Sequence, residues 1–209
     1  MKIAVLTLDG FNELDSFIAA GILNRMRAKG WESLITTPTE QVTSMNGVTI
    51  TGQRGLDFLP EADAVLVGSG IKTRDYAADA GFLSQLQIDP ARQWVGAQCS
   101  GTLLLAKLGL IGDLPVCTDL TTKPWVIEAG VKVIEAPFVA HGRVATAGGL
   151  YVVAVSGGMD DRLHGLAGRC GRSHLLRRAG GRERTLRRDG QKSHRALSGP
   201  AVSRSLTPN

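Results

Sequence analysis

Three continuous apolar runs constrain the fold of this chain more than any other feature. They occupy residues 3–8, 64–67 and 94–97. A strand with one solvated face alternates apolar and polar residues, whereas a strand covered on both faces reads as an unbroken apolar run. Segments with helical periodicity follow these runs, at residues 14–29, 77–88 and 102–108. Strands that alternate with helices predict an α/β fold with a mostly parallel sheet and helices on both faces.

Shorter patterns complete the predicted fold. They indicate strands at residues 31–37, 48–51, 115–118 and 131–135, strand arms at 138–140 and 144–146, and a helix at 123–129. Ligands of such sheets bind beyond the carboxyl ends of the strands. Three of the predicted strands end just before the segments that carry Asp15, Gly68–Gly70 and Cys99. We therefore expect these segments to meet at one edge of the sheet.

Composition and cysteine usage limit the class of protein. The chain has 209 residues, of which 43% are hydrophobic, enough for one α/β domain with a sizeable core. The first apolar run ends at Asp9, too early for a signal peptide, and no segment approaches the length of a membrane span. Cys99, Cys117 and Cys170 show neither metal-ligand spacing nor an even disulfide set. We expect a cytoplasmic protein without a metal site and without membrane contact.

The positive charge of the chain is confined to its C-terminal part. Residues 1–150 contain 12 Lys and Arg against 15 Asp and Glu, whereas residues 151–209 contain 12 Lys and Arg against four Asp and Glu. This shift predicts an α/β domain over residues 1–150 and an irregular, Arg- and Gly-rich tail over residues 151–209. The net charge of +5 therefore does not indicate that the main domain binds nucleic acid.

The tail of residues 151–209 has three interpretations. It shows no sustained helical stripe, and 11 of its 12 cations are Arg. Our preferred hypothesis is translation out of frame from a GC-rich gene, which yields Arg, Gly, Ala, Ser and Pro without buried periodicity. The alternatives are a solvated linker and an arm that binds nucleic acid through phosphates. An out-of-frame tail would leave one face of the sheet without its covering helix and would weaken a homodimer.

The segment around Cys99 has the pattern of a strand, a tight turn and a helix. An apolar strand at residues 94–97 precedes Cys99, Ser100 and Gly101 form the turn, and a Leu-rich helix follows. This is the arrangement of a nucleophile elbow with Cys in place of Ser. The N–H groups and the dipole of the helix predict a lowered thiol pKa and a nucleophilic thiolate. The alternative is a buried structural thiol, the more common role of a free cysteine.

Asp15 is the candidate acid partner of this cysteine. It lies in the first turn of the predicted helix at residues 14–29, between Leu14 and Phe17. Acidic residues are favoured in the first turn of any helix, so Asp15 and Glu13 also have a purely structural explanation. A carboxyl that is half-buried among apolar residues titrates high, however, and can stay protonated and donate a hydrogen bond to a thiolate.

These segments together resemble the ThiJ/PfpI superfamily, also called the class I glutamine amidotransferase-like group. The resemblance covers residues 1 to about 150 and rests on KIAVLTLDGFNELD, AVLVGSG, AQCSGTLLLAKLGL and VATAGG, in this order. It implies a flavodoxin-like sheet, a nucleophilic Cys99 and a hydrogen bond from Asp15 to its sulfur. It also implies an oxyanion hole formed by backbone N–H groups of Ser69, Gly70 and Ser100. A homodimer is the partner state that the superfamily suggests.

Within the superfamily, the chain is most similar to the isonitrile hydratase branch. The resemblance implies a lyase or hydrolase that adds water to a small electrophilic substrate, through a thioimidate on Cys99 and without a metal or organic cofactor. The chain departs from this branch at Asp119, where the branch has His, and from the family at Ser69, where the family has Gly. The alternatives are glyoxalase or deglycase activity on 2-oxoaldehydes, a non-catalytic ligand-sensing domain, and an inactive family member.

Overall fold

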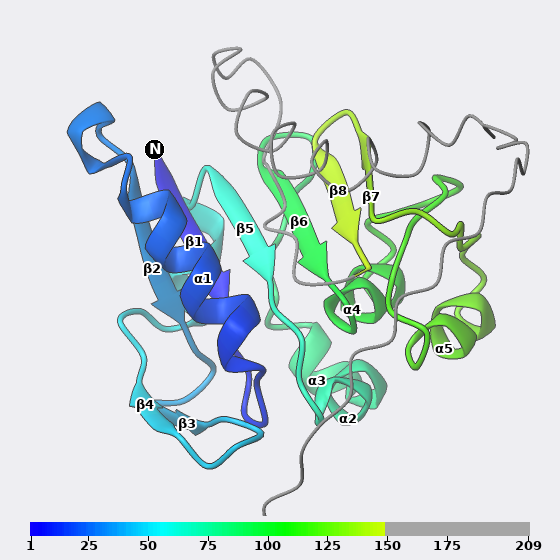
Figure 1. Cartoon of the computed structure of the whole chain (residues 1–209), viewed down its shortest axis with the longest axis horizontal. Coiled ribbons are helices and arrows are strands. Elements are labelled where there is room, and N and C mark those ends of the chain that lie inside the picture. The colour runs from blue at the N-terminus through cyan, green and yellow to red at the C-terminus, as the bar shows by residue number, and fades with distance from the viewer. Residues whose placement is uncertain (149–209) are drawn as a thin grey trace, which may run out of the picture. The chain divides into compact units, whose positions relative to one another are not determined.

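Six strands form the main sheet of the computed structural model, which describes residues 1–148 (Figure 1). The strand order is β2-β1-β5-β6-β8-β7, and every neighbouring pair is parallel except β7 and β8. The strands are β1 (Lys2–Leu6), β2 (Glu32–Thr36), β5 (Ala64–Val67), β6 (Trp94–Gln98), β7 (Phe138–His141) and β8 (Val144–Ala147). The predicted α/β class with a mostly parallel sheet is confirmed. The predicted boundary at residue 150 and the tail of residues 151–209 lie outside the described residues.

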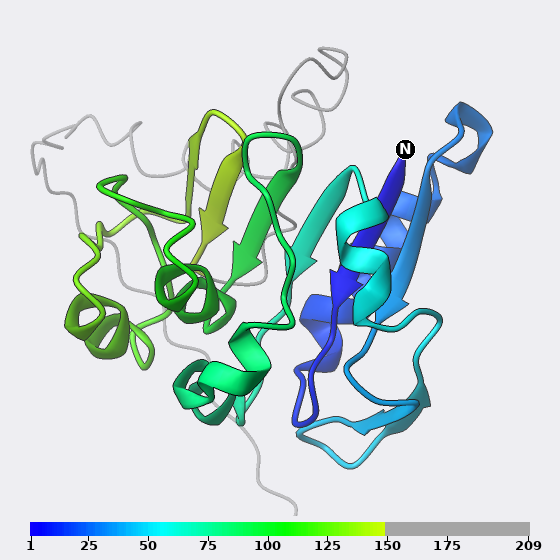
Figure 2. The same cartoon turned by 180° about the vertical axis from the view of Figure 1, so that it is seen from behind.

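The apolar runs form the central strands because both faces of the sheet are covered. Every residue of β5 is buried, as is every residue of β1 and β6 except the first. Helix α1 (Glu13–Asn24) packs on β1 and β2 from the face that is in front in Figure 1. The 3-10 turn Leu56–Glu61 contacts the same two strands and lies over β1 on the opposite face (Figure 2). Helix α4 (Gly101–Lys107) contacts β5 and β6.

Helix α1 presents a different face to the sheet from the one that its apolar pattern predicts. Its most apolar stripe is 40–49% exposed; this stripe consists of Leu14, Phe17, Ile18 and Ile22. The buried residues are Asp15, Ser16, Ala19 and Leu23, a stripe one position further along the chain. Two of these side chains are small, which lets the helix approach the sheet closely. The face of α1 that packs on the sheet is therefore not its most apolar one, and this orientation turns Asp15 inward.

Three other predicted elements also differ from the structure. The helix expected at residues 77–88 is replaced by α2 (Thr73–Ala78) and α3 (Ala80–Leu83). Asp79 separates them because it lies in an extended conformation and its side chain accepts the Phe82 N–H as the N-cap of α3. The strands expected at 115–118 and 131–135 reduce to a single bridge between Val116 and Val133.

The helix expected at residues 14–29 ends at Asn24 and is followed by a 3-10 turn at Arg27–Lys29, whereas helix α5 (Lys123–Glu128) and strand β4 (Thr49–Thr51) agree with the predicted patterns. Helix α5 begins with Pro124 in its first turn, where the missing N–H of proline costs nothing. A hairpin of β3 (Gln41–Thr43) and β4 stands apart from the main sheet. The β3 arm of this hairpin falls in a segment that reads as a polar loop. No helix within residues 1–148 is long and apolar enough to cross a membrane.

Candidate functional site

Cys99 occupies a strained turn between β6 and α4. Its φ is 45°, the only positive φ at a non-glycine residue within residues 1–148. Backbone hydrogen bonds hold it there, since its N–H donates to Ala147 O at 2.8 Å and its carbonyl accepts from Thr102 N at 3.2 Å. The hydroxyl of Thr118 also donates to the Cys99 carbonyl, at 2.7 Å. A non-glycine residue in this region costs about 1–3 kcal/mol, and such residues concentrate at functional sites.

Gly101 makes this turn possible. A Cβ at this position would lie 2.5 Å from the carbonyl oxygen of Val67 and 2.8 Å from that of Gly68. Helix α4 can therefore approach the end of β5 this closely only if residue 101 is glycine. The glycine of the Cys-x-Gly pattern is thus required by the close contact of α4 with the end of β5. The carboxyl ends of β1, β5 and β6 point to one edge of the sheet, as predicted (Figure 2).

Asp15 points into the molecule from the first turn of α1. Its residue is only 2% exposed, and its Oδ2 accepts a hydrogen bond from the Ser69 hydroxyl. Its Oδ1 is buried and finds no hydrogen-bond partner within the described part of the chain. Burial raises the pKa of this carboxyl, and the hydrogen bonds from Ser69 oppose that rise. Asp15 is therefore a desolvated acid rather than a simple first-turn carboxylate.

Glu13 takes the structural role that was equally open to both acids. The carboxylate of Glu13 accepts hydrogen bonds from the hydroxyl of Ser44 and from the side-chain amide of Asn46 at 2.8 Å. It thereby ties α1 to the loop between β3 and β4. The two acids of this helix turn, two residues apart, thus have separate surroundings.

The structure brings Asp15, Ser69 and Cys99 together. The raised pKa of Cys99, about 12, has burial as its largest cause, followed by the charges of Asp15 and Asp119. Hydrogen bonding by the Ser69 side chain lowers the pKa of Cys99, but by less than burial and the two charges raise it. The expectation of a lowered thiol pKa is therefore wrong. The reason is that the thiol is partly desolvated and that the negative charges of Asp15 and Asp119 disfavour the thiolate.

Gly70 and Ser100, two of the expected oxyanion donors, lie in direct contact. The Gly70 N–H donates to the Ser100 hydroxyl at 3.1 Å, and this hydroxyl lies 3.0 Å from the Thr73 hydroxyl, to which it donates. A Cβ at residue 70 would lie 2.5 Å from the Gly10 carbonyl, so the loop needs glycine there. The Gly70 N–H can consequently reach a ligand only after the Ser100 hydroxyl turns away.

The side chains of Asp119 and Thr118 were not selected from the sequence as functional, and Ser69 was selected only for its backbone N–H. Asp119 Oδ1 accepts from Thr121 N and Thr122 N, both at 2.9 Å, and so holds the turn before α5. Its charge also raises the pKa of Asp15 and of Cys99. The Thr118 hydroxyl supports the Cys99 carbonyl, and the Ser69 hydroxyl binds Asp15. For Ser69 and Asp119 the available signal was their departure from the family pattern.

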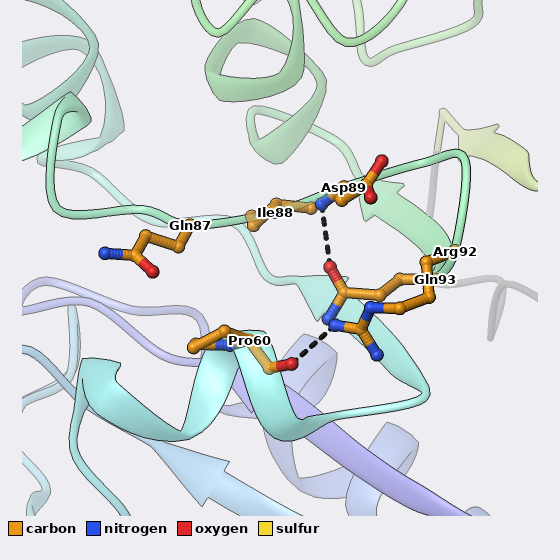
Figure 3. A pocket seen from close by; sticks show the side chains of 6 residues that line it. All are labelled: Pro60, Gln87, Ile88, Asp89, Arg92 and Gln93. Carbon is orange, nitrogen blue, oxygen red and sulfur yellow. Dashed lines mark hydrogen bonds between the residues drawn. The ribbon is translucent and has the colours of Figure 1, made fainter.

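One cavity lies away from Cys99. It has a volume of about 360 Å³ and is formed by the loops that precede β5 and β6 (Figure 3). The polar groups in its wall bind one another: Gln93 Oε1 accepts from Asp89 N at 2.7 Å, and Arg92 donates to the Pro60 carbonyl. These hydrogen bonds fasten the two loops to each other. A second cavity of about 300 Å³ adjoins the Cys99 turn through Thr118.

Metal chemistry has no set of ligands in this region. Within residues 1–148, no group of three His, Cys, Asp or Glu side chains is placed to hold a metal ion.

Comparisons with known proteins agree with this architecture. Residues 1–153 match the DJ-1/PfpI family. Among solved structures, Schizosaccharomyces pombe DJ-1 is similar with a TM-score of 0.62 and 18% identity, over 86% of this chain and 93% of that chain. A ThiJ/PfpI family protein from Pseudomonas syringae has a TM-score of 0.64 and 20% identity, over 87% and 76%.

A DJ-1 superfamily protein from Salmonella typhimurium, solved as a cysteine-to-alanine mutant, has a TM-score of 0.63 and 21% identity, over 84% of this chain and 97% of that chain. The search of the curated proteins found no match. The structural neighbours are too distant in sequence to show more than the shared fold. The family match covers most of the chain, including Asp15, Ser69 and Cys99. The chain therefore belongs to the DJ-1/PfpI family.

Proposed function

We propose that the protein is a cysteine-dependent enzyme that adds water to an isonitrile and releases an N-formamide. One observation carries this proposal: Cys99 is held in a strained strand-to-helix turn, and the charge of the buried Asp15 carboxyl acts on its thiol. Membership in the DJ-1/PfpI family supports a cysteine-based function at a coarser level, as an enzyme or a sensor. The isonitrile as substrate rests on the combination of Asp15, Cys99 and Ser100.

The first step joins the sulfur of Cys99 to the terminal carbon of the isonitrile. Because the pKa of the thiol is raised to about 12, almost none of it is ionised at neutral pH. Asp15 therefore takes the thiol proton as the sulfur attacks and returns it to the same carbon. The product is a thioimidate that contains the whole isonitrile and the elements of the thiol. Such a covalent intermediate divides one difficult addition into two easier steps.

The second step releases the product. Water adds to the thioimidate carbon while one of its protons passes through Asp15 to the imidate nitrogen; the carbon–sulfur bond then breaks as the proton of the added hydroxyl moves to the sulfur. The net reaction is isonitrile plus water to N-formamide, so no oxidant or reductant is needed. The backbone N–H groups of Ser69, Gly70 and Ser100 are the proposed donors to developing negative charge. Use of the Gly70 N–H requires that the Ser100 hydroxyl rotates away from it.

One observation favours a second candidate, a ligand-sensing domain without turnover. A thiol whose pKa is about 12 stays protonated unless a base takes its proton. If Asp15 does not act as this base, Cys99 can line a binding site without attacking a ligand. The two candidates differ in whether Cys99 becomes covalently modified by the substrate.

The test uses the purified full-length chain and a panel of aromatic isonitriles and 2-oxoaldehydes. We expect formation of the N-formamide, detected by mass spectrometry, by the wild type and by Cys117→Ser but not by Cys99→Ser. Cys117 is the matched control because it is a second buried thiol of the same domain. Turnover only of 2-oxoaldehydes would replace the isonitrile by that substrate class. Binding without turnover of any compound would favour the sensor.

A further inference from the structure

Within residues 1–148, one side chain binds the backbone of the strained Cys99, and it is that of Thr118. The Thr118 hydroxyl donates to the Cys99 carbonyl at 2.7 Å and lies 3.5 Å from Asp119 Oδ2. Because a hydroxyl has one hydrogen, the shorter contact, to the carbonyl, receives it. The Cys99 carbonyl also accepts from the backbone N–H of Thr102, at 3.2 Å. The bond from Thr118 is therefore the shorter of the two that fix this carbonyl.

The chain on either side holds Thr118 in place. Val116, two residues earlier, forms the bridge to Val133. The carbonyl of Cys117 accepts from the fully buried Thr102 hydroxyl at 3.2 Å. The Thr118 side chain is β-branched, which restricts its χ1 rotation. Its hydroxyl is therefore a fixed donor that can determine the direction of the carbonyl it binds.

We propose that Thr118 is a positioning residue, whose hydroxyl fixes the Cys99–Ser100 peptide so that the Ser100 N–H is directed at the negative charge that develops on the substrate. Thr118 would thus act on the reaction from 19 residues further along the chain than Cys99. The proposal rests on the proposed function in one respect, namely that Cys99 is the nucleophile and the Ser100 N–H a donor beside it.

One peptide unit connects the carbonyl that Thr118 binds to the proposed donor. The Cys99 carbonyl and the Ser100 N–H belong to the same planar unit, in which the two bonds point in opposite directions. A rotation that moves the carbonyl therefore moves the N–H as well. The φ of Cys99, 45°, lies in a region that persists only where the surroundings enforce it. The Thr118 hydroxyl is one of the groups that enforce it.

The Ser100 N–H is the proposed donor for which no protein group competes. It donates to no other residue in the described part of the chain. The Gly70 N–H, in contrast, already donates to the Ser100 hydroxyl at 3.1 Å. A hydrogen bond to the Cys99 carbonyl also polarises the peptide unit and strengthens its N–H as a donor. Thr118 therefore affects both the direction and the strength of this donor.

The experiment compares two reactions of the Cys99 thiol in the full-length chain. With p-nitrophenyl acetate, a bond forms between the sulfur and the acetyl carbon, the ester carbon–oxygen bond breaks and p-nitrophenol leaves, after an oxyanion has formed on the acetyl oxygen. Iodoacetamide alkylates the same sulfur by displacing iodide and forms no oxyanion. Both rates are measured at one pH, so that ionisation of the thiol affects them equally, and peptide mass spectrometry verifies that Cys99 is the labelled residue.

Thr118→Val removes the hydroxyl at nearly constant volume. We expect it to slow acetylation of Cys99 by about tenfold and to change alkylation by less than about twofold, because a misdirected donor loses part of the stabilisation of the oxyanion. Thr118→Ala, a second variant without the hydroxyl, should behave in the same way. Thr118→Ser keeps the hydroxyl and should restore the wild-type rate of acetylation, which a purely structural loss would not predict.

Thr37→Val is the matched control. The Thr37 hydroxyl also donates to a main-chain carbonyl at 2.7 Å, that of Thr39, but it follows β2, which β1 and β5 separate from β6. This variant should change neither rate, and circular dichroism checks that every protein is folded. Neither reaction needs an isonitrile, so a failure of isonitrile turnover would overturn the proposed substrate without deciding the role of Thr118.

Four outcomes would overturn the role of Thr118. The first is a wild-type rate of acetylation in both Thr118→Val and Thr118→Ala. The second is an equal slowing of acetylation and alkylation, because Thr118 would then act on the sulfur and not on the donor. The third is a failure of Thr118→Ser to restore acetylation. The fourth is that the folded wild type is not acetylated at Cys99, because no donor would then be in place.

Discussion

The two cysteines of the described domain show that a raised thiol pKa does not by itself separate a nucleophile from a structural residue. Burial raises the pKa of both Cys99 and Cys117. Cys117 is fully buried, its N–H donates to the Thr146 hydroxyl at 2.9 Å, and its sulfur donates to the Thr146 carbonyl at 3.0 Å. Cys99 instead has a strained backbone, and the charge of the buried Asp15 acts on its thiol. A nearby proton acceptor distinguishes the two thiols, whereas burial does not.

The largest expected difference between the two thiols is catalytic. We expect Cys99→Ser to lower turnover at least about a thousandfold, as loss of a nucleophile does in enzymes with covalent intermediates. Cys117→Ser should change turnover by less than a factor of a few, apart from any loss of stability. Equal losses in both variants, in proteins that are equally folded by circular dichroism, would show that the comparison assigns the nucleophile wrongly.

The next effect tests the strained turn that only Cys99 occupies. Gly101→Ala introduces a Cβ 2.5 Å from the Val67 carbonyl, and we expect a loss of about 1–3 kcal/mol in the free energy of unfolding. Turnover should fall further than this loss explains, since the turn positions Cys99. Gly21→Ala is the control, because a Cβ there meets nothing within 4 Å in the middle of α1. Denaturant titration should show equal or greater stability for this control.

Thr146→Val tests the surroundings of Cys117. It removes the hydroxyl that accepts the buried Cys117 N–H, so the free energy of unfolding should fall by about 1–3 kcal/mol. The pKa of Cys117 should rise further, because hydrogen bonding by Thr146 lowers it. The pH profile of Cys99 alkylation should stay the same. A matching shift at Cys99 would mean that the two thiols share one network.

The smallest expected effect comes from Asp119→Asn. The Asp119 charge raises the pKa of Cys99 but is not among the causes that act on Cys117. Removing this charge should lower the Cys99 pKa and increase the thiolate fraction at any pH below it. Alkylation of Cys99 at pH 8 should therefore become about two- to fivefold faster, a fraction of a pKa unit. Asparagine keeps the oxygen that caps Thr121 and Thr122, and unchanged thermal melting would exclude a structural cause.

Sequence patterns were sufficient to predict the sheet, because a strand that is buried on both faces reads as an unbroken apolar run. The central strands, the turn at Cys99 and helix α5 all lie where their patterns place them. Short segments were less predictable. The helix expected at residues 77–88 breaks at Asp79, whose capping hydrogen bond competes with continuation of the helix. The sequence predicted that Gly70 and Ser100 contribute to the same oxyanion hole. Their mutual hydrogen bond could not be predicted, because it depends on side-chain packing.

The amino-acid sequence alone determined the α/β fold, the family and the position of Cys99 between a strand and a helix, because these follow from local periodicity and motif spacing. Only the tertiary structure decided which face of α1 is buried, and therefore that Asp15 points inward while Leu14 and Ile18 stay exposed. It also decided that Ser69 binds Asp15 and that the Asp15 charge acts on the Cys99 thiol. The physical reason is that the burial and the electrostatic surroundings of each side chain at the site depend on segments that are far apart in the chain.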